Sequence, residues 1–343
     1  MLVRDAATLG EGWHHRRGDA HAEVEALRDA GARGLDVRGS TAYVSLEPCD
    51  HHGLTPPCSE ALIAAGIARA VIGSLDPDPR TAGGGVRRLL AAGIAVDVVD
   101  DPGSRAIVEA FRWRAAHPER PFLTLKMAQS LDGFIAPHQG AQYWLTGGPA
   151  RERVREMRIE HDAVMVGAGT VRIDDPLLTV RPHHVRRKPY TRVVACERAP
   201  IPRASRILQP PADAPAEAYA RTIVLAPAGA RDRFAGLEDV ADVLYAGDPA
   251  STELDLPAAL LALRARGITS VLCEGGPTLA ARLLSLGAVQ RAVWFVAPVL
   301  LRGPDAVPVL AGAVPLDGWR FDESERAGED LMLTLELHAC SAG

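Results

Sequence analysis

Residues 21–58 carry the pattern from which the architecture of the first third of this chain can be inferred: they open with His-Ala-Glu and close with Pro-Cys, eight further residues and Cys. His21, Cys49 and Cys58 offer one imidazole and two thiolates as metal ligands. Three protein ligands leave one position of a zinc tetrahedron open, which is typical of catalytic sites because water can bind there and lose its proton near neutral pH. Glu23, which coordination does not require, is then available to move protons.

The residues around these ligands predict two helices. Asp19 is expected to cap the helix that carries His21, and the Thr-Pro-Pro segment 55–57 is expected to open the helix that carries Cys58. A positive helix end favours a thiolate at Cys58. Two alternatives stay open: ordinary surface and core residues without a metal, or a structural zinc module that supports a partner interface. Glu23 argues against the structural module, since such a site needs no extra carboxylate.

Size, composition and charge limit the class of protein. A chain of 343 residues predicts two domains, and its 47% apolar and 24% charged residues are typical of a water-soluble globular protein. The formal net charge of −5 disfavours a nucleic-acid partner and favours a small-molecule substrate. Five scattered cysteines indicate a reducing compartment, and no apolar run has the length of a membrane span, so we expect a cytoplasmic protein.

Short apolar runs alternate with amphipathic stretches along the chain, which predicts an α/β fold. In the first third, the expected strands are 2–3, 41–46, 70–72 and 95–99, and the expected helices are 21–30 and 58–65, closed by Gly31 and Gly66. The proline-containing segment 115–121 is predicted to connect two domains, 1–117 and 121–343. Residues 199–217, rich in proline and alanine, are predicted to be a surface connection.

The second domain contains a glycine turn between an apolar run and a helix. Residues 274–278 read Glu-Gly-Gly-Pro-Thr, after the apolar stretch 268–273 and before the helical stretch 279–286. Glycines allow a backbone to approach an anion, and a helix N-terminus stabilises it. The turn therefore suits a cofactor phosphate, although a plain tight connection is the alternative.

These motifs together resemble the bifunctional riboflavin biosynthesis deaminase/reductase family. The resemblance is carried by 21–24, by Leu-Glu-Pro-Cys-Asp-His-His-Gly-Leu-Thr-Pro-Pro-Cys at 46–58 and by Asp-Pro-Asp-Pro at 76–79. It continues through 125–133, 144–147, 167–170, 174–181 and 274–278, and so covers nearly the whole chain. It implies a cytidine-deaminase-like three-layer α/β/α domain followed by a dihydrofolate-reductase-like α/β domain.

The resemblance also implies an activity. The family deaminates a diamino-ribosylamino-pyrimidinone phosphate with zinc and then reduces the ribosyl chain to ribityl with NADPH, and we expect a homo-oligomer. It implies zinc at His21, Cys49 and Cys58, with Glu23 as general acid and base. The implied NADPH contacts are Ala128, Trp144, Thr170, Asp174, Gly276, Pro277, Thr278, Leu279, Ala280, Ala281 and Arg282. The implied substrate contacts are Lys126, Arg158, Leu178, Arg181 and Glu274. Surface ion pairs for the arginines and an ordinary strand position for Lys126 are the alternatives.

The chain departs from the family pattern at several positions. It opens within the first long strand, without the family's N-terminal helix and Pro-Asn-Pro turn, and Leu54 and Asp78 stand where a cation and an asparagine are usual. In the second domain, Phe134, Gln142 and the pair Cys196-Glu197 replace the usual lysine, serine and Asp-Ser. A glutamate near a cofactor phosphate would repel it if it faced inward. The alternative hypothesis is a reductase-only or specialised paralogue with an impaired deaminase domain.

Overall fold

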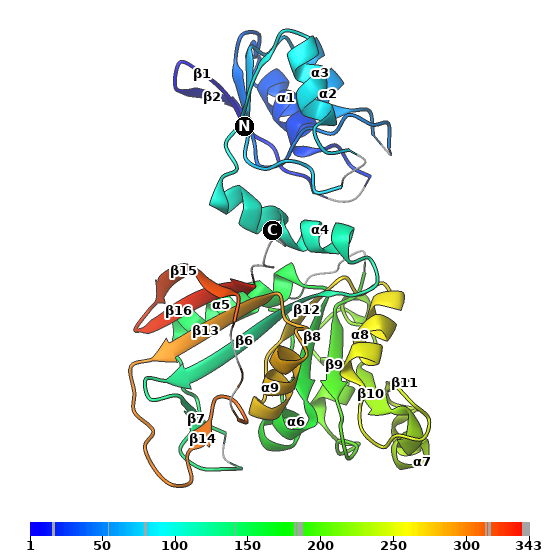
Figure 1. Ribbon diagram of the computed structural model, residues 1–343. Coiled ribbons are helices and arrows are strands. Elements are labelled where there is room, and N and C mark those ends of the chain that lie inside the picture. The colour runs from blue at the N-terminus through cyan, green and yellow to red at the C-terminus, as the bar shows by residue number, and fades with distance from the viewer. Residues whose placement is uncertain are drawn as a thin grey trace. The chain divides into compact units, whose positions relative to one another are not determined.

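The computed structural model describes residues 1–15, 18–53, 55–78, 81–140, 142–181, 183, 188–312, 314 and 317–337. The chain separates into two compact units, Met1–Pro118 and Glu119–Gly343 (Figure 1). Each unit has its own sheet, and each is described separately below. Leu54 lies outside the described residues.

The first unit is built on a five-stranded sheet in the order β2-β1-β3-β4-β5. Its strands are β1 (Leu2–Arg4), β2 (Ala7–Gly10), β3 (Thr41–Val44), β4 (Arg69–Ile72) and β5 (Ala95–Val98). β3, β4 and β5 are parallel, whereas β1 runs antiparallel to both of its neighbours. The helices are α1 (Ala22–Ala32), α2 (Cys58–Ala64), α3 (Gly84–Ala91) and α4 (Pro102–Ala116). The strands and helices predicted from the apolar runs are therefore present.

The core of the first unit joins the sheet to its helices. Ala26 of α1, Leu62 of α2 and Leu89 of α3 pack in one cluster with the strand residues Ala42 and Ile72. All five side chains have 1% exposure or less. This packing holds the N-terminal ends of α1 and α2 against the sheet, and those ends carry the predicted metal ligands.

The second unit is built on a nine-stranded sheet in the order β11-β10-β9-β8-β12-β6-β13-β16-β15. The seven strands from β11 to β13 in this order are parallel, and β16 and β15 complete one edge as an antiparallel hairpin. The strands are β6 (Phe122–Ser130), β8 (Ala163–Gly167), β9 (Thr191–Ala195), β10 (Ile223–Pro227), β11 (Asp242–Ala246), β12 (Ser270–Cys273), β13 (Arg291–Ala297), β15 (Trp319–Ala327) and β16 (Asp330–Leu337). A small separate ribbon pairs β7 (Phe134–Ala136) with β14 (Val307–Pro308).

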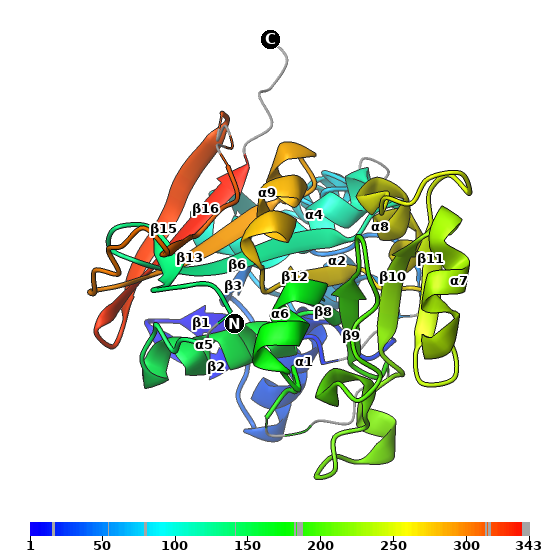
Figure 2. The same cartoon turned by 90° about the horizontal axis from the view of Figure 1, so that it is seen from below.

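Helices cover both faces of this sheet, as a near-continuous apolar parallel sheet requires. α8 (Leu256–Ala265) and α9 (Pro277–Ser285) pack on one face. α5 (Gly148–Glu160), α6 (Ala168–Asp174) and α7 (Arg231–Phe234) pack on the other. Figure 2 shows α9 and α6 on opposite sides of the sheet, with their N-terminal ends near the same strand ends.

Three local expectations were wrong. His21, not Asp19, occupies the position before α1, and no side chain caps that helix. α1 continues through Gly31 to Ala32, and the left-handed glycine that follows it is Gly34, with φ of 67°. Residues 199–217 are more than a surface connection, because Ile207 is fully buried and packs into the core of the second unit. The apolar residues between the prolines of this segment could have indicated that it contributes to the core.

Candidate active sites

The three predicted metal ligands come from two helix starts and one loop. His21 lies immediately before α1, Cys58 is the first residue of α2, and Cys49 lies in the loop that follows β3. Parallel strands place the ends of successive βα units at one edge of a sheet, and this brings residues 28 and 37 positions apart in sequence together.

The donor atoms of these residues meet at one point. The Sγ atoms of Cys49 and Cys58 lie 3.5 and 3.3 Å from Nδ1 of His21. All three ligand atoms lie within 4.8 Å of one another. Two sulfurs and an imidazole nitrogen at such separations fit three corners of a zinc tetrahedron, with a fourth corner free for water.

The two thiols differ in acidity. Hydrogen bonding from the Cys58 thiol, and from the Cys58 N–H at 3.3 Å, lowers the pKa of Cys49 to about 5. The pKa of Cys58 is raised, because Cys49 holds its proton and its surroundings are buried. The Cys58 N–H, at the start of α2, therefore favours a thiolate at Cys49. A bound metal would deprotonate both.

Glu23 lies in the first turn of α1, two residues after His21. Burial raises the pKa of its carboxyl group above the usual value. His14 is exposed and packs edge-on against His21, with ring centroids 5.2 Å apart. The carboxylate is therefore beside the donor set without belonging to it.

Glu47 was quoted in the motif but given no role by sequence reasoning. Its side chain is 4% exposed and accepts hydrogen bonds from the N–H groups of Asp76, Gly83 and Val86 at 2.9–3.1 Å. At Gly85 of the same segment, a Cβ atom would lie 2.0 Å from the Pro48 carbonyl oxygen. Glu47 thus ties the loop that carries Cys49 to the start of α3, and a charged residue between apolar positions was its only signal.

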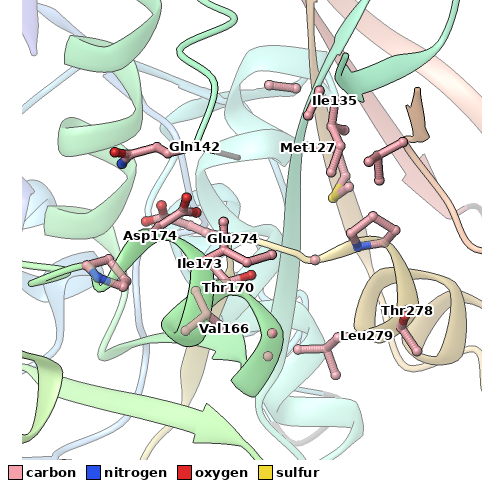
Figure 3. Close-up of a pocket in the computed structure, with 18 of the residues that line it drawn as sticks. Met127, Ile135, Gln142, Val166, Thr170, Ile173, Asp174, Glu274, Thr278 and Leu279 are labelled. Carbon is pink, nitrogen blue, oxygen red and sulfur yellow. The ribbon is translucent and has the colours of Figure 1, made fainter. Parts of the chain in front are cut away.

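The second unit contains a large cavity, about 1450 Å³ in volume, on the side of the sheet where α6 and α9 begin. Figure 3 shows Thr170 and Asp174 projecting from α6, and Thr278 and Leu279 from α9. The predicted residues that line the cavity are Lys126, Ala128, Trp144, Arg158, Thr170, Asp174, Leu178, Glu274, Gly276, Pro277, Thr278 and Leu279. The structure therefore gathers most of the predicted cofactor and substrate contacts around one space.

Four predicted contacts lie elsewhere. Leu279 is the last residue of α9 that lines the cavity in the described part of the chain, because Ala280 and Ala281 are buried in the protein core. Arg282 forms an ion pair with Glu197 and donates to the Leu254 carbonyl at 2.9 Å. Arg181 is half-exposed and lies 3.5 Å from Asp213. None of these four lines the cavity in the described part of the chain.

The glycine turn before α9 is shaped as expected for a close backbone approach. Gly275 and Gly276 have φ of 81° and 84°, which only glycine adopts without strain. A Cβ at Gly275 would lie 2.8 Å from Sδ of Met127, so side chains are excluded from the turn. Pro277 opens α9, whose first N–H groups are free to face an anion.

Charged side chains line the cavity beside this turn. Arg158, on α5, forms a two-pronged ion pair with Glu274, with Nη2 2.8 Å from Oε2, and it donates to the Thr179 carbonyl at 2.9 Å. The Arg158 guanidinium lowers the pKa of Glu274 despite its burial. Burial lowers the pKa of Lys126. Lys126, Arg158 and Glu274 thus place charged groups of both signs together on this part of the wall.

Two family descriptions match this chain. The cytidine and deoxycytidylate deaminase zinc-binding region matches residues 1–74, and the RibD C-terminal domain matches residues 121–333. The chain is 36% identical to the riboflavin biosynthesis protein RibD of Escherichia coli K12, over 98% of this chain and 91% of the relative. It is also 36% identical to RibD of Synechocystis, over 100% of this chain and 86% of the relative.

The chain belongs to the RibD family of riboflavin biosynthesis proteins. Solved structures agree: Acinetobacter baumannii RibD is 32% identical with a TM-score of 0.73, covering 98% of this chain and 91% of that one. A Thermotoga maritima structure, described as a diaminohydroxyphosphoribosylaminopyrimidine deaminase/5-amino-6-(5-phosphoribosylamino)uracil reductase, is 29% identical with a TM-score of 0.73, covering 98% and 90%.

Membership in the RibD family confirms the resemblance, the two-part α/β fold and the bifunctional deaminase and reductase function in riboflavin biosynthesis. It supports zinc in the first unit, where the three donors meet, and a nicotinamide cofactor in the second. No helix in the described ranges is both long and apolar enough to cross a lipid bilayer. The substrates are small molecules.

One RibD departure has a structural compensation. Glu197 lines the cavity, but its carboxylate is paired with the guanidinium of Arg282. Arg172 and Arg198 line the same region, and sequence reasoning assigned them no role. The glutamate is therefore partly neutralised by Arg282, and two further arginines line the same cavity.

Proposed function

We propose that residues 1–117 deaminate 2,5-diamino-6-ribosylamino-4(3H)-pyrimidinone 5′-phosphate and that residues 121–343 reduce the product. The observation that carries the first half is the meeting of His21 Nδ1 with the two thiols, beside the Glu23 carboxylate that is not among the three donors. Zinc held there would acidify a bound water. In the reaction, water adds to the ring carbon, the exocyclic C–N bond breaks and ammonia leaves.

Glu23 is the proposed proton carrier. Its place in the first turn of α1, two residues after the ligand His21, and its hydrogen bond with the Cys58 thiol support this role. It would take a proton from the attacking water and deliver one to the departing nitrogen. Glu47 acts only as a positioning residue, because all three of its hydrogen bonds go to backbone N–H groups.

In the reductase half, NADPH would supply a hydride and the protein would bind and orient the reactants. The glycine turn at Gly275 and Gly276 and the start of α9 suit the cofactor's phosphates, and Thr170 and Asp174 line the same cavity. Arg172 and Arg198 support NADPH over NADH, because guanidinium groups recognise phosphate.

The substrate would lie against Lys126, Arg158 and Glu274. Arg158 is held in place by Glu274 and by the Thr179 carbonyl, which leaves its remaining donor capacity for a substrate oxygen. Lys126, buried beside Glu274, could orient the ribosyl group. In its protonated form it could give a proton to the ring oxygen as the bond from that oxygen to the anomeric carbon breaks and hydride adds to that carbon. A homo-oligomeric assembly and a cytoplasmic location stay predictions.

Glu23→Gln tests the deaminase assignment. The amide keeps the size of the side chain but cannot carry the proton, so we expect deamination to fall by about 10²–10⁴-fold. Zinc content and NADPH-dependent reduction of the deaminated substrate should be unchanged. Zinc can be measured by metal analysis, and ammonia release and NADPH absorbance can be followed separately. Unchanged ammonia release in the Gln variant would refute the assignment.

A further inference from the structure

A second, smaller cavity lies in the unit formed by residues 119–343. It has a volume of about 340 Å³ and shares no described lining residue with the large cavity. Its walls come from Arg192 of β9, from the proline-rich segment around Gln209 and from Tyr219 and Thr222 before β10. Its volume lies at the small end of the range of ligand pockets.

Arg192 is the unusual residue of this wall. It is 2% exposed and sits within a strand of the central sheet. Its Nη1 donates to the Gln209 carbonyl oxygen at 3.1 Å, and its guanidinium carbon lies 5.5 Å from the centre of the Tyr219 ring. Its Nε is buried and has no hydrogen-bond acceptor among the described residues. A buried charge without a partner is costly, so such a group normally has an anion beside it.

The charge of Arg192 is not balanced by the protein. No aspartate or glutamate lines this cavity within the described ranges, and its other charged wall residue is a second arginine, Arg221. Burial lowers the pKa of Arg192 to about 10, which still leaves the guanidinium protonated at neutral pH. The charged groups that line the cavity are therefore cations.

Three other polar side chains of the wall already have partners. The Tyr219 hydroxyl donates to the Val180 carbonyl at 3.1 Å and accepts from the Val180 N–H at 2.9 Å. The Thr222 hydroxyl donates to the Ile207 carbonyl at 2.5 Å. Arg221 is half-exposed and lies 3.3 Å from Asp242. The unused donor capacity of the wall thus belongs mainly to Arg192.

We propose that this cavity binds a small oxyanion, a carboxylate or phosphate group, with Arg192 as its principal ligand. A guanidinium offers two parallel N–H donors along one edge, and these match two oxygens of such a group. With Nη1 committed to Gln209 and Nε enclosed by the protein, the N–H groups of Nη2 remain for the ligand. The site is separate from the phosphate contacts of the reductase cavity, so it does not depend on the proposed reaction.

The test uses the full chain and isothermal titration calorimetry with two probes, inorganic phosphate and succinate. The wild-type protein is expected to bind one equivalent more of at least one probe than Arg192→Met does. Arg192→Lys keeps the charge but lacks the paired donors, and we expect at least tenfold weaker binding at this site. Arg231→Met is the matched control, because Arg231 also stacks on a tyrosine, at 4.2 Å from the Tyr245 ring, but is exposed.

The outcomes separate clearly. Loss of the extra equivalent in the Met variant but not in the Arg231 control supports the site, and the probe that binds identifies the anion class. Equal isotherms for wild type, Arg192→Met and Arg192→Lys with both probes would overturn the proposal. If the Met variant does not fold, crystals of the wild-type protein with selenate provide the second measurement. Anomalous density beside the Arg192 guanidinium would support the proposal, and its absence at saturating selenate would reject it.

Discussion

At the scale of single residues, one carboxylate and one guanidinium set the charge of part of the reductase cavity wall. Glu197 faces the reductase cavity, and Arg282, from the helix that follows the glycine turn, neutralises it. A family position usually occupied by Asp-Ser thus has a longer acid here, with a cation as its partner. The acid reduces the attraction of this region for phosphate, and the arginine limits that reduction.

Glu197→Gln should strengthen NADPH binding. Removal of one negative charge frees Arg282. Two unit charges about 4 Å apart in water interact by about 1 kcal/mol, so we expect about a fivefold lower Kd for NADPH. NADH, which lacks the 2′-phosphate, should change less, and fluorescence titration with both cofactors measures the difference. Arg282→Met is the control of opposite sign. Equal gains for NADPH and NADH would show that Glu197 does not face the 2′-phosphate.

At the scale of elements, buried polar groups fix the two ends of a helix that carries site residues. Asp330, the first residue of β16, is 3% exposed and accepts from the Gly147 N–H at 2.8 Å, immediately before α5. His161, just after α5, bonds the Met157 carbonyl at 2.6 Å and Thr124 of β6 at 2.9 Å. Both ends of the helix that carries Arg158 are therefore anchored.

Asp330→Ala should loosen the start of α5. The Gly147 N–H would lose its acceptor in a part-buried setting, so we expect unfolding of this unit to become easier by about 1–3 kcal/mol. The KM for NADPH should rise, because Trp144, three residues before Gly147, lines the cavity. Denaturant unfolding and steady-state kinetics give the two values. Asp330→Asn keeps an acceptor oxygen, and a loss as large as that of alanine would contradict this role.

His161 should make stability depend on pH. Burial lowers its pKa below the usual value, so between these two pKa values the unfolded chain binds more protons than the folded chain. The free energy of unfolding should therefore fall as pH drops through about 6.5, by up to about 1.4 kcal/mol per pH unit. Chemical denaturation from pH 8 to pH 5 measures this slope. His161→Gln should show a shallower slope, and parallel curves would exclude His161 as the cause.

At the scale of the whole molecule, each unit has its own sheet and core, so the two activities should fail independently. Chelation of zinc should abolish ammonia release and leave NADPH oxidation on the deaminated substrate within about twofold of its starting value. Calorimetry of the metal-free chain should show a lower transition temperature for the first unit only, because metal binding stabilises the folded state. Restored ammonia release on addition of zinc is the control. A matching loss of both activities would contradict this independence.

Local chemistry in the sequence was enough to predict the metal donors, the glycine turn and the alternation of strands and helices, because each depends on residue type and spacing along the chain. His21, Cys49 and Cys58 had the composition of an open zinc site, and periodic apolar runs placed the main strands. Long-range packing decided the rest. Glu47 and the Arg282–Glu197 pair form contacts between segments that are distant in sequence. Arg192 is left without a charged partner by the way the surrounding segments pack. Burial and partner geometry determine what such groups do, and both exist only once the chain has folded.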